Sequence, residues 1–235
     1  MTAVYAHRGA SAAHRENTRE AFVAAVEMGA DGVELDVRRM AGGALAVHHD
    51  AHLPDGRPLW ELASADLPSH VPSLAEALAW CGELVVNVEI KNWPRDPDHD
   101  PTLQLAVAVA AIVAPMGERA IVSSFNLADV DRVRAIDPTI PTGTLATFGP
   151  DADVAGRFVD RARRGGHTAV HPHHGAVTPH LVELAHAVGL RVNTWTVDDP
   201  DRIRSLAALG VDGIVTNVPD VALAALDRTP APGTS

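Results

Sequence analysis

The sequence predicts an α/β protein that folds as one (β/α)8 TIM barrel, and three observations support this. Short runs rich in Val, Ile and Leu alternate with Ala- and Leu-rich stretches of helical period along the whole chain. Eight such strand–helix units in 235 residues lie near the lower end of the size range of this fold. No Gly-rich dinucleotide-binding motif follows the first strand, which argues against the competing architecture, an open doubly wound sheet.

The predicted strands are short, apolar and bounded by turn residues. They cover 3–7, 32–38, 84–91, 120–125, 142–147, 169–173, 191–197 and 213–217. An additional short strand at 44–49 is predicted to form a hairpin with the second of these. The predicted helices cover 18–29, 73–81, 101–115, 127–136, 151–164, 178–188, 200–209 and 219–227. Many begin after a cap or turn residue, such as Asn17, Asp151, Thr178 and Asp199, and glycines stand at several of their ends, at Gly29, Gly165, Gly189 and Gly210.

The remaining segments complete a single domain over residues 1–228. Segments 53–72 and 92–101 are predicted to be loops. The tail 229–235 is rich in Pro, Gly and Thr and is predicted to be disordered, because it has too little apolar content to pack.

The composition excludes several classes of function. Lys and Arg number 19 against 30 Asp and Glu, and the net charge of −11 argues against nucleic acid or another polyphosphate partner held by bulk electrostatics. The single cysteine, Cys81, excludes an internal disulfide framework and a multi-cysteine zinc site. No signal peptide is recognisable, and the longest apolar stretch, 105–116, is shorter than the roughly 20 residues of a membrane span. We therefore expect a soluble, cytoplasmic protein with no membrane partner.

Two predicted strands carry polar residues at every second position. Alternate side chains of a barrel strand face the barrel interior and the helix layer. In the second strand this places Glu34 and Asp36 on the inner face, and in the next barrel strand it places Asn87, Glu89 and Lys91 there. Three carboxylates in one barrel mouth would repel one another unless a cation joined them, and a hard divalent ion bound by oxygen atoms fits this arrangement. The alternative is a buried layer of ion pairs in which Glu89 binds Lys91 or Arg8.

The ends of two strands add groups that suit phosphate chemistry. His7 and Arg8 follow the first strand, and His49 follows the short hairpin strand. Histidine transfers protons near neutral pH, and arginine binds a pair of phosphate oxygens while it stays charged. Seven other histidines are predicted to lie on the surface or in loops: His14, His52, His70, His99, His167, His180 and His186. Three more are interpreted as a polar loop that lines the site rather than as a metal cluster: His171, His173 and His174.

These residues resemble the glycerophosphodiester phosphodiesterase family, within the phospholipase C-like phosphodiesterase barrels. The matching blocks occur in family order over nearly the whole chain. They are His7-Arg8-Gly9, Glu16-Asn17-Thr18, Ala21-Phe22, Gly29 to Val37, His49-Asp50, Glu89-Ile90-Lys91, Ser124-Phe125, Trp195-Thr196-Val197 and Gly210 to Gly213. The resemblance implies the same (β/α)8 fold and a part in glycerol and lipid metabolism.

The resemblance also implies a role for each site residue. The residues that hold a divalent metal, Mg²⁺ or Ca²⁺, would be Glu34, Asp36 and Glu89. The acid–base pair would be His7 as the base and His49 as the acid, and phosphate contacts would come from Arg8 and Lys91. The substrate would be a small phosphodiester, hydrolysed to an alcohol and glycerol 3-phosphate, either through a cyclic phosphate or by direct attack of water. Trp195 would offer an apolar wall to the glycerol carbons, unless it is an aromatic residue of the barrel core.

The chain departs from the family pattern at three places. The segment between His49-Asp50 and the next helix is short, Asn217 stands where the family usually has Asp, and Arg38 to Ala41 replaces a Thr/Lys-Asp turn. The short segment leaves the headgroup open. Two alternatives remain: a related phosphodiesterase that acts on another headgroup, such as a lysophospholipase D, and a non-catalytic anion-binding barrel. The presence of both His7 and His49 argues against the second.

Overall fold

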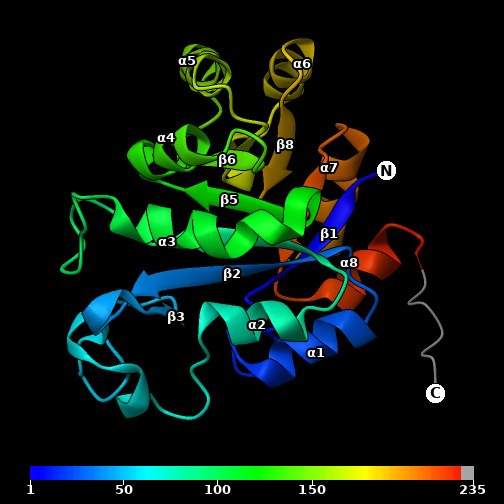
Figure 1. Cartoon of the computed structure of the whole chain (residues 1–235). Coiled ribbons are helices and arrows are strands. Elements are labelled where there is room, and N and C mark those ends of the chain that lie inside the picture. The colour runs from blue at the N-terminus through cyan, green and yellow to red at the C-terminus, as the bar shows by residue number, and fades with distance from the viewer. Residues whose placement is uncertain (229–235) are drawn as a thin grey trace.

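The computed structural model describes residues 1–228 and contains a closed barrel of parallel strands, as predicted (Figure 1). Its strands are β1 (Ala3–His7), β2 (Gly32–Arg39), β4 (Val85–Ile90), β5 (Ala120–Ser124), β6 (Thr142–Ala146), β7 (Ala169–Pro172), β8 (Arg191–Thr194) and β9 (Gly213–Thr216). The first strand pairs with both β2 and β9 and so closes the barrel. The extra strand β3 (Leu45–Val47) pairs antiparallel with the end of β2, outside the barrel. The tail predicted to be disordered, 229–235, lies outside the described residues.

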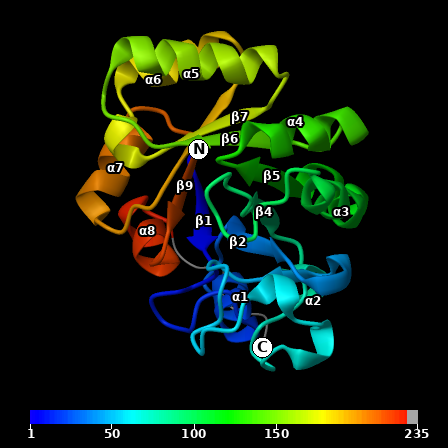
Figure 2. The same ribbon diagram turned by 90° about the vertical axis from the view of Figure 1, so that its left-hand side faces the viewer.

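The helices surround the barrel (Figure 2). They are α1 (Arg19–Glu27), α2 (Leu74–Trp80), α3 (Gln104–Val113), α4 (Leu127–Ile136), α5 (Ala152–Arg164), α6 (Pro179–Ala187), α7 (Pro200–Ala208) and α8 (Pro219–Ala225). The predicted helix 101–115 is shorter at both ends, because Leu103 adopts a left-handed φ of 58° and a 3-10 helix containing Pro115 follows Val113. The predicted loop 53–72 contains two 3-10 turns, Leu59–Glu61 and Ser64–Asp66.

Asn17 does not cap the first helix. Thr18 caps α1, and its hydroxyl accepts a hydrogen bond from the backbone N–H of Ala21. Asn17 adopts a left-handed φ of 56°, which asparagine tolerates better than most residues, and its side chain is buried. The side-chain amide of Asn17 is thereby directed into the barrel mouth instead of the helix end.

The predicted alternation along β2 and β4 is confirmed. Val33, Leu35 and Val37 of β2 belong to a core cluster between the barrel and the helices, together with the corresponding apolar residues of β4. Burial of this apolar surface stabilises the barrel and fixes the register of its strands, because a shift by one residue would bring the carboxylates into the core. The intervening polar residues therefore face the barrel interior.

Of the predictions for histidines, one holds only in part and one was wrong. His167 lies in a loop, as predicted, but it is buried, since its Nδ1 lies 2.9 Å from the Thr142 hydroxyl and its Nε2 lies 3.2 Å from Asp131. His171 is part of β7 and is buried in the barrel interior, where its Nε2 lies 3.1 Å from the side-chain nitrogen of Asn193. A Cβ atom at Gly143 would lie 2.5 Å from that ring, so the neighbouring strand needs glycine there. Sequence periodicity cannot distinguish such a buried histidine from one in a loop.

Burial of His171 predicts a pH dependence of stability. Desolvation lowers the pKa of His171 from 6.5 to about 4, so the folded protein keeps this imidazole neutral. Between pH 6.5 and pH 4 the unfolded chain binds a proton at His171 and the folded chain does not. The free energy of unfolding therefore falls as the pH falls from 6.5 to 4. The expected loss is about 3 kcal/mol of the free energy of unfolding.

Denaturant unfolding of the wild type and of His171→Gln, from pH 7 to pH 4, tests this expectation. The wild type should lose more stability than the variant over this interval. A His171 pKa above 6 in an NMR titration of the folded wild type would contradict it, whether or not the variant folds.

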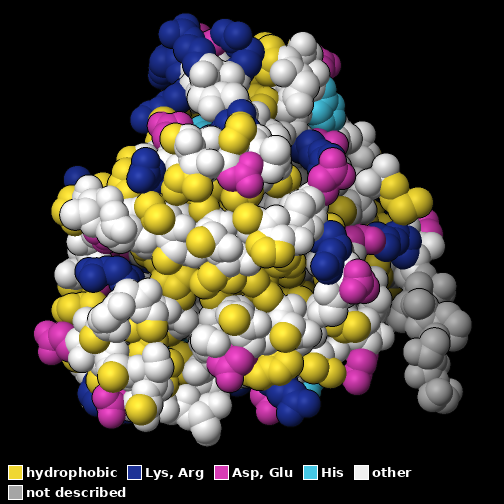
Figure 3. Space-filling model, in the orientation of Figure 1, with side chains coloured by type: hydrophobic (Ala, Val, Ile, Leu, Met, Phe, Trp, Pro, Cys, Tyr) yellow, Lys and Arg dark blue, Asp and Glu magenta, His cyan; other side chains and the backbone are white. Residues whose placement is uncertain are grey.

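The surface charge is uneven. The last turn of α5 carries three arginines, Arg161, Arg163 and Arg164, and basic side chains gather over this helix at the top of Figure 3. This local positive charge contrasts with the net charge of −11 of the whole chain. Within residues 1–228, every helix is too short or too polar to cross a lipid bilayer.

Candidate active site

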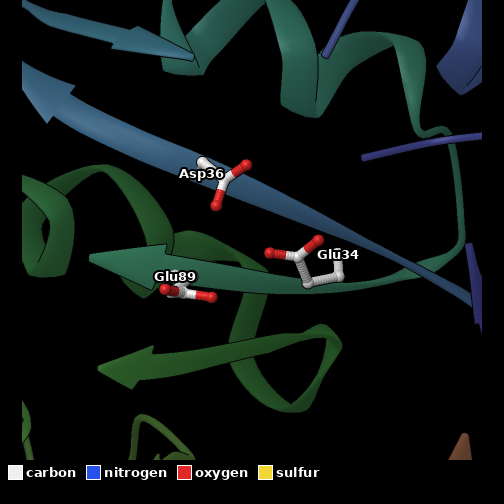
Figure 4. Close-up of side chains that lie close together, drawn as sticks. All are labelled: Glu34, Asp36 and Glu89. Carbon is white, nitrogen blue, oxygen red and sulfur yellow. The ribbon is translucent and has the colours of Figure 1, made fainter. Parts of the chain in front are cut away.

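Strand register brings the three predicted carboxylates together at the mouth of the barrel. Asp36 of β2 pairs in register with Glu89 of β4, and Glu34 lies two residues before Asp36 on the same inner face. One oxygen from each carboxylate can be chosen so that all three lie within 4.8 Å of one another (Figure 4). His7 at the end of β1 pairs in register with Glu34. The four side chains thus share the carboxyl ends of three adjacent strands, where active sites of this fold lie.

The carboxylates are buried and only partly hydrogen-bonded. Glu34 accepts a hydrogen bond from the backbone N–H of Arg8 at 3.2 Å, and Asp36 accepts one from the amide of Asn17 at 2.9 Å. Oε1 of Glu34 is buried without a hydrogen-bond donor among the described residues, and Oδ1 of Asp36 accepts no hydrogen bond but lies 3.3 Å from the Lys91 ammonium. Buried carboxylate oxygens that converge on one point, one of them without a donor, fit a hard divalent cation, which binds oxygen ligands.

The pKa values of the three carboxyl groups show how burial and the neighbouring charges act on this cluster. Burial, with the neighbouring charges of Asp36 and Glu89, raises the pKa of Glu34 well above its usual value. Burial also raises the pKa of Glu89, although Lys91 opposes this. Burial acts against ionisation of Asp36 too, but Lys91 and Arg8 outweigh it and lower its pKa. The cluster therefore has more negative charge than its own cations neutralise, which also fits a bound cation.

Both predicted phosphate-binding cations lie against these carboxylates. Lys91 Nζ lies 2.7 Å from Glu89 and 3.3 Å from Asp36. Arg8 Nε lies 3.1 Å from Asp36, and its Nη1 binds the exposed carboxylate of Glu16. The alternative prediction of a buried ion-pair layer is thus correct for Glu89 and Lys91. Burial works against the charge of Lys91, but Glu89 and Asp36 raise its pKa, so the ammonium stays charged.

His7 is oriented by an amide that is itself fixed. Its Nδ1 lies 2.7 Å from Oδ1 of Asn217, and because this oxygen can only accept, Nδ1 carries the proton and Nε2 is free to accept one. Asn217 cannot flip its amide, since its Nδ2 donates to Asp198 at 2.7 Å and its Oδ1 accepts from Ser11 at 2.9 Å. Burial, aided by the Arg8 charge, lowers the pKa of His7 and favours this neutral ring.

His49 is oriented by a charged partner. Its Nδ1 lies 2.7 Å from Asp50 Oδ1, which leaves its Nε2 for other contacts, and its side chain is 34% exposed. The backbone oxygen of His49 accepts a hydrogen bond from Arg38 Nε at 2.6 Å. Arg38 is held in turn by Asp98 at 2.7 Å. Arg38, one of the residues that depart from the family pattern, is therefore a buried side chain that holds the loop carrying His49.

Trp195 lies at the same mouth but beyond the end of its strand. The predicted strand 191–197 ends at Thr194, and the indole N–H of Trp195 donates to the backbone oxygen of His171 at 2.8 Å. The ring contacts Phe125 and His173 edge-to-face, with centroids 5.5 Å and 5.3 Å apart. Trp195 is half-buried, so one part of its ring packs on the barrel and the other can contact a ligand.

Sequence reasoning missed the supporting residues around the histidines. They are Asn217, which in the sequence is only a departure from the family pattern, and Asp198, which belongs to no motif. For Asn217, a role in the site could have been predicted from its position in the fold. It directly follows β9, and β9 neighbours the strand that ends at His7. Polar residues at the carboxyl ends of adjacent parallel strands are candidates for one site.

The fold and this cluster together define the class: the protein is an enzyme built on a (β/α)8 barrel, with its polar site at the carboxyl ends of the strands. The sequence model of the glycerophosphoryl diester phosphodiesterase family matches residues 7–221. The chain therefore belongs to the glycerophosphoryl diester phosphodiesterase family.

Relatives with this name resemble the chain over nearly its whole length. A glycerophosphodiester phosphodiesterase of Caldanaerobacter subterraneus subsp. tengcongensis is 31% identical over 242 residues, covering 93% of this chain and 95% of the relative. The crystal structure of a glycerophosphodiester phosphodiesterase from Thermotoga maritima has a TM-score of 0.79 at 28% identity, covering 97% of this chain and 99% of that one. A crystal structure from Silicibacter pomeroyi DSS-3, named for the same family, has a TM-score of 0.86 at 31% identity and covers 97% and 93%.

Proposed function

We propose that the protein hydrolyses glycerophosphodiesters to an alcohol and glycerol 3-phosphate, with a divalent metal ion and with His7 and His49 as the acid–base pair. The observation that carries this proposal is the convergence of three carboxylates, two cations and His7 on one barrel mouth, with His49 lining the same cavity as Glu89 and Lys91. Family membership and the names of the full-length relatives support the diester as the substrate.

The residues present fit the proposed metal. Glu34, Asp36 and Glu89 would hold Mg²⁺ or Ca²⁺, since their converging carboxylate oxygens, among them the unpartnered Oε1 of Glu34, suit a hard cation. Such an ion supplies charge stabilisation to a phosphoryl oxygen. Arg8 and Lys91 border the same carboxylates, so a phosphate at this point would meet both cations. Their fixed positive charge would stabilise the negative charge that grows on the phosphate as the nucleophile arrives.

Two proton transfers complete the proposed reaction. Nε2 of His7, with its lone pair exposed by the hydrogen bond at Nδ1, would accept the proton of the attacking hydroxyl. Nε2 of His49 would donate a proton to the oxygen of the departing alcohol as its bond to phosphorus breaks. The attacking hydroxyl would be that of the substrate glycerol, which gives a cyclic phosphate that water then opens, or that of water directly. Trp195 would pack against the glycerol carbons.

Product analysis tests the proposed function. Incubation with a glycerophosphodiester should release glycerol 3-phosphate and the free headgroup alcohol, detected by an enzyme-coupled assay and by mass spectrometry. Release of a phosphorylated headgroup and free glycerol would show cleavage of the other ester bond and contradict the proposal.

Loss of the Arg8 guanidinium is expected to weaken diester binding. Charge-assisted hydrogen bonds are each worth roughly 1.5–3 kcal/mol, so Arg8→Ala should raise KM by about ten- to a hundredfold. Arg8→Lys should recover only part of this, because a single ammonium lacks the planar pair of donors. Steady-state kinetics of both variants, with the exposed Arg119→Ala as the matched control, measure the effect. If the kinetics of Arg8→Ala equalled those of the wild type, the role of Arg8 would be limited to its ion pairs with Asp36 and Glu16.

A further inference from the structure

A cavity of about 660 Å³ opens beside the proposed reaction centre. It is lined at one end by Glu89, Lys91 and His49. From there it crosses the ends of β5 and β6 and reaches the beginning of α4 and the second half of α5, the helices that come before and after β6 in the chain (Figure 1). The cavity is thus continuous with the centre and extends well beyond the space that a phosphate fills.

The proposed chemistry defines which part of the substrate enters this cavity. His49 lines it, whereas His7 and Trp195 are not among its lining residues. If His49 protonates the departing oxygen, the leaving alcohol lies on the His49 side of the phosphorus, and the glycerol lies on the side of His7. The cavity is then the site of the leaving alcohol. This step rests on the proposed function.

The walls of the cavity are mainly apolar. Beyond the reaction centre they are formed by large aliphatic and aromatic side chains: Ile90, Trp93, Phe125, Leu127, Leu145 and Phe158. Among the other charged side chains of the wall, Arg38 is buried and binds Asp98 at 2.7 Å and Asp96 at 3.2 Å, and Arg161 lies at an exposed position of α5. A charged headgroup in the apolar part would lose water and find no buried, unpaired counter-ion to replace it, whereas an alkyl group would gain from leaving water.

The size of the cavity leads to the same conclusion. Cavities of roughly 300–1,000 Å³ hold ligands of drug size, and a headgroup such as ethanolamine is far smaller. A small polar alcohol would leave most of the apolar wall in contact with water, while a longer apolar alcohol would cover it.

We propose that this cavity binds an apolar leaving alcohol, so that the preferred substrates are esters of glycerol 3-phosphate with alkyl-type alcohols. In the reaction the bond from phosphorus to the alkyl oxygen breaks and that oxygen takes a proton from His49. A new bond forms from phosphorus to the attacking oxygen, whose proton goes to His7. No oxidant, reductant or further co-substrate is needed besides water.

A series of straight-chain esters tests the proposal on the metal-loaded wild-type protein. The ethyl, butyl and hexyl esters of glycerol 3-phosphate have leaving alcohols of nearly equal acidity, so differences in rate report binding in the cavity. Burial of one methylene is worth about 0.8 kcal/mol, so kcat/KM should rise by up to about fourfold for each added methylene. A flat or falling series, with glycerol 3-phosphate still released, would overturn the inference and leave the proposed function intact. Failure to hydrolyse any ester would overturn both.

A matched pair of headgroups tests the role of charge. Choline and 3,3-dimethylbutanol have nearly the same shape, but only choline is charged. The 3,3-dimethylbutyl ester should have the higher kcat/KM, although the ammonium makes choline the better leaving group. A preference for the choline ester would contradict the inference and favour binding of the cation on the faces of Trp93 and Phe125.

A substitution in the cavity wall tests whether the alkyl chain of the substrate binds there. Leu127→Gln replaces a lining side chain at the first position of α4 and should flatten the dependence on chain length. Val188→Gln, at an exposed position after α6, is the control and should keep the wild-type slope. An unchanged slope in folded Leu127→Gln, shown by circular dichroism, would contradict the placement of the alkyl chain in this cavity.

Discussion

His7→Ala and His49→Ala are each expected to lower kcat by about 10²–10⁴-fold while the protein still folds and still binds metal. The reason is that each ring presents a free Nε2 to the site, His7 through its contact with Asn217 and His49 through its contact with Asp50. Steady-state kinetics on a glycerophosphodiester measure the loss. His180→Ala, at an exposed position of α6, is the control and should behave as the wild type.

The two histidine variants should respond differently to the leaving group. A nitrophenol departs without help from an acid, so His49→Ala should lose much less activity on an aryl phosphodiester than on an alkyl ester. His7→Ala should lose activity on both, because the attacking hydroxyl still needs a base. Equal residual activity of both variants on both substrates would contradict the assignment of base and acid. Undiminished turnover in both would remove the histidines from the mechanism.

The second large effect is expected at Glu34. Its charge is disfavoured by burial and by the other two carboxylates, so Glu34→Gln should keep or raise the stability of the metal-free protein. The same change removes a proposed ligand. Because loss of even a group that supports a ligand costs about 10–100-fold in metal affinity, the affinity should fall by at least about tenfold, and activity with it.

Two measurements on Glu34→Gln distinguish whether Glu34 binds metal or only stabilises the barrel. Titration calorimetry with Mg²⁺ and with Ca²⁺ reports affinity, and denaturant unfolding without metal reports stability. Glu83→Gln, whose side chain is almost fully exposed, is the control. A large loss of stability without a change in metal affinity would assign Glu34 to the structure of the barrel. Asp36→Asn is less decisive, because Asp36 also neutralises Arg8 and Lys91.

The fold was predictable because its signals are periodic. Val33, Leu35 and Val37 alternate with Glu34 and Asp36, and only a strand with one polar inner face is consistent with both sets. The hairpin strand β3 could be predicted because its apolar run is short and follows β2 closely. The start of α3 could not, since the left-handed residue Leu103 precedes it. Such backbone conformations depend on contacts made by other parts of the chain.

The candidate site was predictable only where strand ends define it. His7, Glu34 and Glu89 lie in or at the end of strands, so strand register alone brings them together. The contacts of Asn217 with His7 join residues that are 210 positions apart in the sequence. The apolar cavity could not be predicted from the sequence either, because its size depends on how far α4 and α5 lie from β6. Periodicity reports which face a residue occupies, but not which distant loops share that face.

The most direct test of the account is the release of glycerol 3-phosphate by one protein preparation in three conditions. These are the protein as purified, the protein after exhaustive chelation verified by metal analysis, and the chelated protein with Mg²⁺ or Ca²⁺ restored. Turnover should be lost on chelation and recovered with the ion, while the melting temperature changes much less, because the barrel has its own apolar core. Full turnover in the verified metal-free protein would contradict the central claim that Glu34, Asp36 and Glu89 form a catalytic metal site.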